Sequence, residues 1–303
     1  MSGWQCPVCA GNRSAPQWRV SSDATENGVN PEAFRPSADR YGETVGEVVR
    51  CLDCGHGSLA VTPSADALAA AYGAAADPAS VDEEAGQLET ARRALQWIET
   101  VVRPGALLDI GCWTGSFVAA SAQRGWSAAG IEPSSWAVDR ARERHLDVRV
   151  GDLANPEVEA ASQRCVAMCD VIEHLLDVRG AIATAATVIE PGGVLYLTTP
   201  DAGSRLARTM GAHWWSVLPM HVQYFTRGSI SRLLQDGGLE VIGITSHPKV
   251  FTASYYADRL GGYSPALARS AKGISRRVGL AERLVAPDLH DRMQVLARKP
   301  TGG

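Results

Sequence analysis

The residues of this chain with the clearest chemical potential are two closely spaced cysteine pairs near its N-terminus. Cys6 and Cys9 form one Cys-x-x-Cys pair, and Cys51 and Cys54 form the other. A glycine follows each pair closely, which lets the backbone turn its N–H groups toward thiolate sulfurs. Four thiolates make a closed, tetrahedral, structural Zn²⁺ site with no open position for catalysis. We therefore predict zinc at these four cysteines, and we expect the nearby His56 to be solvated rather than a ligand.

Two acidic residues are further candidates for ligand binding, because each lies in or at the end of an apolar run. Asp109 stands in the run at 106–110, where a carboxylate is costly unless a cation or N–H donors pair with it. Glu132 ends the run at 128–131, twenty-one residues after Gly111. This is where a nucleotide-binding α/β unit places an acid for ribose hydroxyls. The spacing of the glycines differs from the dinucleotide pattern, however, because Gly111 and Gly115 lie four residues apart.

The elements that position these acids alternate along the chain from residue 106 onward. The pattern predicts strands at 106–111, 127–131, 147–150, 165–170, 193–199, 239–246 and 292–298, and helices at 115–124, 134–145, 178–189 and 228–236. An amphipathic helix precedes the first strand and is expected to end at the Pro-Gly pair at 104–105. Such alternation indicates a parallel sheet with helices on both faces, and ligands gather at the carboxyl ends of its strands.

Three short motifs resemble those of class I S-adenosylmethionine-dependent methyltransferases. LLDIGCWTG at 107–115 resembles motif I, in which a glycine usually stands at the position of Trp113. GIEPS at 130–134 and GDL at 151–153 resemble the next two motifs in order. The resemblance covers about residues 80–246. It implies an α/β fold with a doubly wound, seven-stranded, Rossmann-like sheet whose last strand is antiparallel.

The resemblance also implies how S-adenosylmethionine would be held. Asp109 would lie near its methionine amino end, Glu132 would bind the two ribose hydroxyls, and Asp152 would accept from the adenine amino group. The backbone from Gly111 to Gly115 would lie against the methionine and the ribose. The complete set of predicted cofactor-binding residues is Asp109, Gly111, Cys112, Trp113, Gly115, Glu132, Pro133, Asp152, Leu153 and Asp170.

Two further stretches resemble the small-molecule branch of the same superfamily and supply candidate catalytic residues. CDVIEHL at 169–175 contains Glu173 and His174, and PMHVQYF at 219–225 contains His221. A neutral imidazole at pH 7 is suited to accept the proton of an oxygen acceptor. His174 is the first candidate base and His221 its rival. Glu173 and His174 could instead order the loop or bind a divalent metal, although the sequence shows no second carboxylate cluster nearby.

Aromatic residues just before this second stretch leave two interpretations open. Trp214 and Trp215 could line a pocket for a planar or glycosyl acceptor, or form a lid packed on the core.

The composition limits where the protein acts. A net charge of -4 gives no general attraction for nucleic acid or anionic membranes. No apolar run is long enough to span a bilayer, and the N-terminus lacks the pattern of a signal peptide. We therefore expect a cytoplasmic protein, and the oligomeric state stays open.

We expect three segments: a zinc-ribbon domain at 1–60, a connector at 61–79, and a methyltransferase domain at 80–303 with an insertion at 250–290. The leading hypothesis is an enzyme that methylates a small molecule, a natural-product or sugar-type acceptor, most simply on oxygen. Two alternatives are an RNA or protein methyltransferase that docks through the ribbon, and a non-catalytic cofactor-binding scaffold. The acidic balance of residues 1–60 disfavours RNA.

Overall fold

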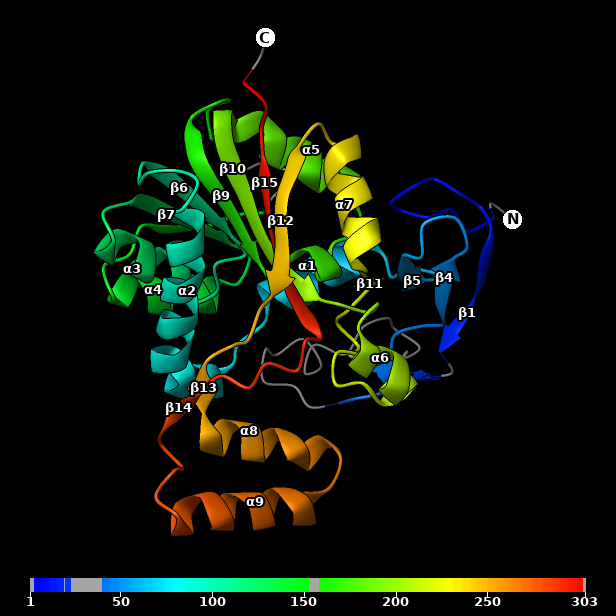
Figure 1. Ribbon diagram of the computed structural model, residues 1–303, viewed down its shortest axis with the longest axis vertical. Coiled ribbons are helices and arrows are strands. Elements are labelled where there is room, and N and C mark those ends of the chain that lie inside the picture. Colours follow the sequence, from blue (N-terminus) through cyan, green and yellow to red (C-terminus); the bar gives the residue numbers. More distant parts are fainter. Residues whose placement is uncertain (1–2, 19, 23–39, 153–157, 302–303) are drawn as a thin grey trace.

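The computed structural model describes residues 3–18, 20–22, 40–152 and 158–301. Its centre is a seven-stranded sheet in the order β12-β15-β10-β9-β6-β7-β8 (Figure 1). β15 runs antiparallel to both of its neighbours, and the other pairs are parallel. The predicted fold is confirmed. The strands are β6 (Ala106–Ile110), β7 (Ser127–Glu132), β8 (Val148–Val150), β9 (Gln163–Cys169), β10 (Ile189–Pro200), β12 (Glu240–Ser246) and β15 (Arg292–Arg298).

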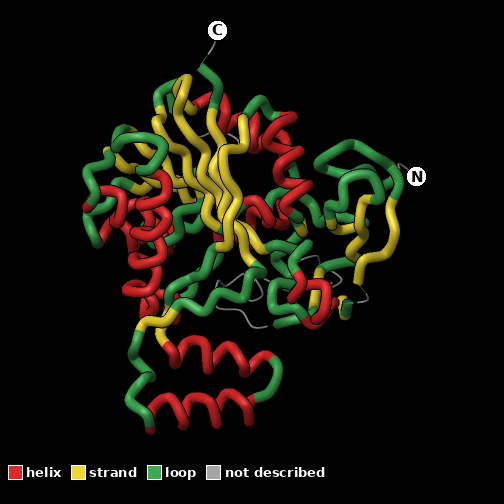
Figure 2. The backbone as a smooth tube through the Cα atoms, viewed as in Figure 1, coloured by secondary structure: helices red, strands yellow, loops and turns green. Residues whose placement is uncertain are grey.

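Helices cover both faces of this sheet (Figure 2). Successive residues of a strand point to opposite faces, so Leu107 packs in one apolar core and Leu108 in the other. The Leu107 face is covered by α2 and α3, and the Leu108 face by α5 and α7. The helices are α2 (Glu84–Ile98), α3 (Ser116–Gln123), α4 (Ser135–Glu143), α5 (Val178–Val188) and α7 (Arg227–Asp236).

Side-chain caps fix where several helices begin. The hydroxyl of Ser134 accepts from the backbone N–H of Ala137 at the start of α4. Thr226 and Ser229 form a reciprocal capping box at the start of α7. Helix α2 ends at Ile98, several residues before the Pro-Gly pair that was expected to end it.

A second, four-stranded sheet joins the N-terminal segment to the rest of the chain. Its order is β1-β4-β5-β11, and all its pairs are antiparallel. Only the first three strands come from the cysteine-rich segment, because β11 lies more than 160 residues later. The strands are β1 (Ser14–Trp18), β4 (Val48–Cys51), β5 (Gly57–Leu59) and β11 (Gln223–Tyr224); β2 (Ser21–Ser22) and β3 (Glu43–Thr44) form a separate parallel pair.

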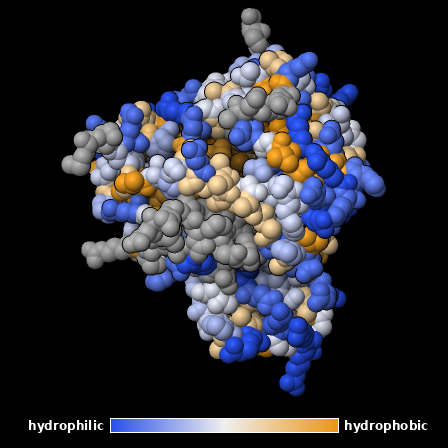
Figure 3. Space-filling model, turned by 180° about the vertical axis from the view of Figure 1, so that it is seen from behind, coloured by the Kyte–Doolittle hydropathy of each residue, from blue (hydrophilic) through white to orange (hydrophobic). Residues whose placement is uncertain are grey.

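The remaining elements surround the carboxyl edge of the large sheet. The region between β12 and β15 forms a helical hairpin that projects at the bottom of Figure 1, and its rear surface in Figure 3 is largely hydrophilic. Among the described residues, no helix has both the length and the apolar character needed to cross a bilayer. The remaining elements are α1 (Ala65–Gly73), η2 (Pro78–Glu83), η3 (Ile172–His174), α6 (Arg205–Met210), η4 (Gly211–His213), β13 (Phe251–Thr252), α8 (Ala253–Arg259), η5 (Leu260–Gly262), α9 (Pro265–Arg277) and β14 (Leu284–Val285).

Gly86→Ala should destabilise the protein, because α2 approaches the start of the hairpin segment without room for a side chain. A Cβ at Gly86 would lie 2.3 Å from the carbonyl oxygen of Val250 and 3.0 Å from Cα of Phe251. We expect the free energy of unfolding in urea to fall by about 1–3 kcal/mol. Gly273→Ala in α9 is the matched control, since nothing lies within 4 Å of its added Cβ. That control should not lose stability, and equal losses in the two variants would contradict the packing argument.

Candidate active site

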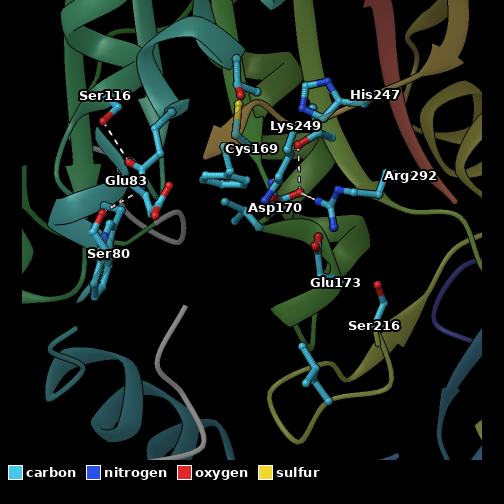
Figure 4. Close-up of a pocket in the computed structure, with 18 of the residues that line it drawn as sticks. Ser80, Glu83, Ser116, Cys169, Asp170, Glu173, Ser216, His247, Lys249 and Arg292 are labelled. Atoms are coloured by element: carbon cyan, nitrogen blue, oxygen red, sulfur yellow. Dashed lines mark hydrogen bonds and ion pairs between the residues drawn. The ribbon is translucent and has the colours of Figure 1, made fainter. Parts of the chain in front are cut away.

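A cavity of about 910 Å³ opens at the carboxyl ends of β6, β7, β9 and β10 (Figure 4). This is the edge where a doubly wound sheet collects its ligands. Its walls include α1 and η2 on one side and the region from residue 247 to the hairpin on another. The cavity brings together the three predicted catalytic residues and the described predicted cofactor residues except Gly115. Gly115 precedes α3 with φ +80°, and a Cβ there would lie 2.7 Å from Cδ1 of Leu146, so it shapes the turn without lining the cavity. Leu153 lies outside the described residues.

Asp109 is buried in β6 with a side chain that lacks full compensation. The residue is 1% exposed, and its Oδ1 has no hydrogen-bond partner among the described residues. Burial raises the pKa of this carboxyl well above its usual value, and the nearby charge of Glu132 adds to the effect. A cationic group placed in the cavity would reverse that effect, so Asp109 is suited to bind an ammonium group.

The turn after β6 is shaped for close approach of a ligand to the backbone. Gly111 has φ +68°, and a Cβ there would lie 2.6 Å from Cγ2 of Val171. Trp113 has φ +49°, a left-handed conformation that is strained for a bulky residue. The strain explains why glycine is usual at this position. In this chain the indole offsets part of the cost, since its Nε1 donates to Ser80 Oγ at 2.9 Å.

Glu132, at the end of β7, fixes the turn through its carboxylate. Its Oε2 accepts from the backbone N–H of Trp113 and its Oε1 from that of Ser134, both at 2.9 Å. Burial raises the pKa of Glu132, and these two hydrogen bonds oppose that rise. Each carboxylate oxygen can accept a second hydrogen bond, so both remain available to hydroxyl donors of a ligand. Cys112, Pro133 and Asp152 also line the cavity.

The two histidines, His174 and His221, meet in this cavity, although 47 residues separate them in sequence. Their ring centroids lie 4.9 Å apart at 67°. Nδ1 of His174 lies 3.0 Å from the carbonyl oxygen of Met220, and Nδ1 of His221 lies 2.7 Å from that of Ser216. Because a carbonyl can only accept, we assign the proton to Nδ1 in both rings, which leaves each Nε2 with a free lone pair. Burial lowers both pKa values, so both imidazoles are neutral at pH 7.

Glu173 completes this cluster. Its side chain is 1% exposed, and Figure 4 shows it projecting into the cavity below Asp170. Its Oε2 has no hydrogen-bond partner within the part of the chain that the structure describes. Burial, with a contribution from the charge of Asp170, raises the pKa of Glu173 to about 8. One potential ligand atom from each of Glu173, His174 and His221 lies within 4.8 Å of the other two.

Asp170 lies on the cavity wall, but its carboxylate already has two cationic partners. Lys249 and Arg292 both form ion pairs with it, as Figure 4 shows, and the hydroxyl of Thr198 donates to its Oδ1 at 3.0 Å. These cations hold the pKa of Asp170 below its usual range against the effect of burial. Its role toward the cofactor stays a prediction.

Lys249 and Arg292 are site residues that the sequence analysis missed. Arg292 is the first residue of β15, which runs antiparallel, so its N-terminal end reaches the edge where the parallel strands end. The sequence analysis expected the last strand to run antiparallel, and this direction alone could have placed Arg292 at the ligand edge of the sheet.

The adjacent tryptophans serve the two purposes that the sequence left open. Trp214 is fully buried, and its Nε1 donates to Oδ2 of Asp291 at 2.9 Å, so it belongs to the core. Trp215 lines the cavity. Tyr255, Tyr256 and Tyr263 of the insertion add further aromatic surface to the cavity wall.

The four N-terminal cysteines come together as their spacing predicts. Their sulfurs lie within 4.8 Å of one another, with Cys6 and Cys54 at 3.6 Å and Cys9 and Cys51 at 3.5 Å. Tetrahedral coordination with bonds of about 2.3 Å requires sulfurs about 3.8 Å apart, so the cluster fits a zinc ion.

The expectation that His56 is solvated is wrong. His56 is 0% exposed, and its Nε2 lies 2.9 Å from Oε1 of Gln223 in β11. The side-chain amide of Gln223 in turn donates to the carbonyl oxygen of Leu175 at 2.9 Å. The backbone N–H of Val222 donates to the carbonyl oxygen of Glu173, also at 2.9 Å. The pairing of β11 with β5 buries the imidazole. The cysteine-rich segment is therefore linked through Gln223 to the backbone beside His174.

Comparison with known proteins identifies the family. Residues 85–244, more than half of the chain, match the family described as "Methyltransferase domain". The chain belongs to this family. The fold agrees with this family, because the described residues form the Rossmann-like, seven-stranded sheet with one antiparallel strand.

Individual relatives agree with this assignment. The chain is 26% identical over 198 residues to a ubiquinone biosynthesis O-methyltransferase of Thiobacillus denitrificans, covering 58% of this chain and 84% of the relative. It is 29% identical over 137 residues to a candidate S-adenosylmethionine-dependent methyltransferase of Mycolicibacterium smegmatis, covering 45% of this chain and 52% of the relative. The chain therefore spans about half the length of some curated relatives that it matches.

Solved structures share the fold. A complex of the Haloferax volcanii Trm112 methyltransferase activator with a candidate methyltransferase matches with a TM-score of 0.50 at 14% identity, covering 73% of this chain and 94% of that chain.

Asp109→Ala and Glu132→Ala should each weaken binding of S-adenosylmethionine, measured by isothermal titration calorimetry. Loss of a hydrogen bond to a charged group costs about 1.5–3 kcal/mol, equivalent to a roughly 10- to 100-fold rise in Kd. Asp288→Asn is the control, because this carboxylate lines the same cavity but accepts from Ser246 and from the backbone N–H of His290. Unchanged affinity in both test variants would show that the cofactor binds elsewhere.

Proposed function

We propose that this methyltransferase transfers a methyl group to a hydroxyl oxygen of a small molecule, and that a histidine accepts the hydroxyl proton. The observation that carries the proposal is the pair of neutral imidazoles whose Nε2 lone pairs are free in the cavity that also contains Asp109 and Glu132. The ubiquinone biosynthesis O-methyltransferases among its relatives support oxygen as the acceptor atom. The predominantly apolar and aromatic cavity supports a small organic acceptor of natural-product or sugar type.

The residues around the turn after β6 fit the cofactor. The unpartnered Oδ1 of Asp109 can accept from an ammonium group, and Glu132 can accept from two hydroxyls while it keeps its backbone hydrogen bonds. When bound, S-adenosylmethionine supplies an electrophilic methyl group on a sulfonium centre. Trp113, Asp152 and the backbone at Gly111 complete the proposed binding surface.

The chain contributes to the reaction mainly by alignment and proton acceptance. Fixing an acceptor oxygen in line with its target can lower the barrier by roughly 7–11 kcal/mol. A base adds about 10²–10⁴ in rate. Nε2 of the base takes the acceptor proton, and its Nδ1–H, already bound to a backbone carbonyl, steadies the resulting imidazolium.

His174 is the better base of the two. It is partly exposed to the cavity, whereas His221 is 6% exposed and its pKa is lowered further, in part by His174.

We also propose that the four cysteines hold a structural Zn²⁺ and that residues 1–60 act as a ribbon that supports the active site. The short S···S separations and the contacts of His56 and Gln223 with the catalytic segment support this role. Arg179 at the start of α5 adds a hydrogen bond to the carbonyl of Val8, between the first two cysteines.

Cys54→Ala should remove this zinc, so that metal analysis of the purified, dialysed protein falls from one equivalent per chain to none. Loss of metal binding is loss of folding energy in such sites, and we expect a lower melting temperature as well. Cys165→Ala is the control, because this buried thiol lies in β9 and should leave the zinc content unchanged. Zinc retained at one equivalent in Cys54→Ala would contradict the assignment.

His174→Ala should lower kcat about 10²- to 10⁴-fold with little change in the Kd for S-adenosylmethionine, and His221→Ala should lower it less. His213→Ala, an exposed histidine of the same region, is the control. Near-normal turnover in both test variants would refute the base assignment.

The pH dependence supplies a second check on the same base. The base must be neutral to act, and the pKa of His174 is lowered from its usual 6.5. The acidic limb of the turnover profile should therefore have its midpoint below pH 6.5, and that limb should be absent in His174→Ala. A wild-type optimum that begins well above pH 7 would indicate a different base.

A further inference from the structure

The Glu173, His174 and His221 cluster has the composition of a metal site as well as that of a base. Two imidazoles and one carboxylate are a ligand set that proteins use for Zn²⁺ and Fe²⁺ and that leaves positions open. We propose that these three residues bind a divalent transition-metal ion of the Zn²⁺ type, and that this ion regulates the active site. The inference rests on the proposed function, because it concerns the groups that accept the proton.

The orientation of the imidazoles supports the site. Histidines that bind metals usually donate their second ring N–H to a backbone carbonyl or a carboxylate, which fixes the ring and presents the other nitrogen. His174 and His221 both have this arrangement, through the carbonyls of Met220 and Ser216. Those hydrogen bonds come from a single loop, residues 216–221, so the loop sets both rings at once.

The carboxylate supplies a second, independent observation. Glu173 is 1% exposed, and its Oε2 is buried without a partner among the described residues. A buried, unpaired carboxylate oxygen is costly, and a cation bound there removes the cost. Glu173 is therefore incompletely satisfied by the protein itself, whereas Asp170 beside it is fully paired with Lys249 and Arg292.

Distance and charge set the expected affinity. One ring nitrogen of each histidine and one carboxylate oxygen of Glu173 lie within 4.8 Å of one another, and tetrahedral bonds of about 2.0–2.1 Å require separations of about 3.4 Å. The side chains must therefore close by roughly 1.4 Å at most, which small side-chain rotations can achieve. The ligand set carries one negative charge at most, and the positive charge of Arg292 opposes the ion. We expect micromolar affinity, weaker than at the four thiolates.

Binding of this ion and catalysis exclude one another. Coordination uses the Nε2 lone pairs that would otherwise accept the proton of the acceptor. An ion at the cluster should therefore inhibit methyl transfer reversibly, and a chelator should restore turnover without removing the zinc held by the four cysteines.

The test is a titration of the intact protein, already loaded with its cysteine-bound zinc, with Zn²⁺ by calorimetry and with Co²⁺ by absorption spectroscopy. The wild type should bind one additional equivalent, and Co²⁺ there should show weak d–d bands without the thiolate charge-transfer bands of a cysteine site. Glu173→Gln and His221→Ala should each weaken this binding at least tenfold, whereas His213→Ala should not. Unchanged S-adenosylmethionine affinity confirms that each variant is folded. Absence of the additional equivalent in the wild type, or its persistence in both cluster variants, would overturn the site.

Turnover measurements separate this inference from the proposed function. If the protein transfers methyl groups in the presence of chelator, but binds no additional ion when chelator is left out, the proposed function stands and the metal site is overturned. An additional ion bound by a protein that methylates no hydroxyl acceptor would retain the site and overturn the proposed function. Turnover that rises with the ion would confirm the site but overturn its inhibitory role and the free imidazole as base.

Discussion

The pairing of β11 with β5 is the constraint on which the arrangement of the active site depends. Two residues of β11 complete a sheet that otherwise belongs to the cysteine-rich segment. The backbone on one side of this short strand carries His221, and its Gln223 side chain reaches the carbonyl after His174. The imidazoles therefore meet because a strand from one part of the chain is bound to a sheet from another. Neither the segment around His174 nor the segment around His221 contains a helix or strand long enough to hold the imidazole in place by itself.

Buried carboxylates dominate the electrostatics of the cavity. Asp109, Glu132 and Glu173 all have pKa values raised by burial, and the first and last each have an oxygen without a partner among the described residues. Such groups lower the stability of the protein alone and raise its affinity for cationic ligands. Asp170 shows the alternative solution, since Lys249 and Arg292 neutralise it within the protein. The cations of the protein therefore neutralise Asp170, whereas Asp109 and Glu173 each keep a carboxylate oxygen without a partner among the described residues.

The sequence predicted the sheet, its helices and the meeting of the candidate residues, because these follow from local periodicity and from the rule that parallel strands end at one edge. Positions set by distant pairing were not accessible in this way. His56 looked solvated because nothing local indicates that β11 will cover it, and Lys249 and Arg292 reach the cavity through the return of β12 and the antiparallel β15. The left-handed backbone of Trp113 was also hidden, because it depends on contacts with Ser80 and Glu132 that come from other elements.

The wall that the insertion contributes to the cavity has a consequence for how such enzymes diversify. Tyr255, Tyr256 and Tyr263 come from the insertion, whereas Asp109 and Glu132 come from strands in the middle of the sheet. No residue of α9 is buried, so this helix can change in sequence with little cost to the core. Tyr255 and Tyr256 in α8 and Tyr263 just before α9 also stand outside the central strands, so they can change without altering the strands that carry Asp109 and Glu132. A single contiguous segment, residues 250–290, is therefore the place to vary this part of the cavity wall by recombination or library design.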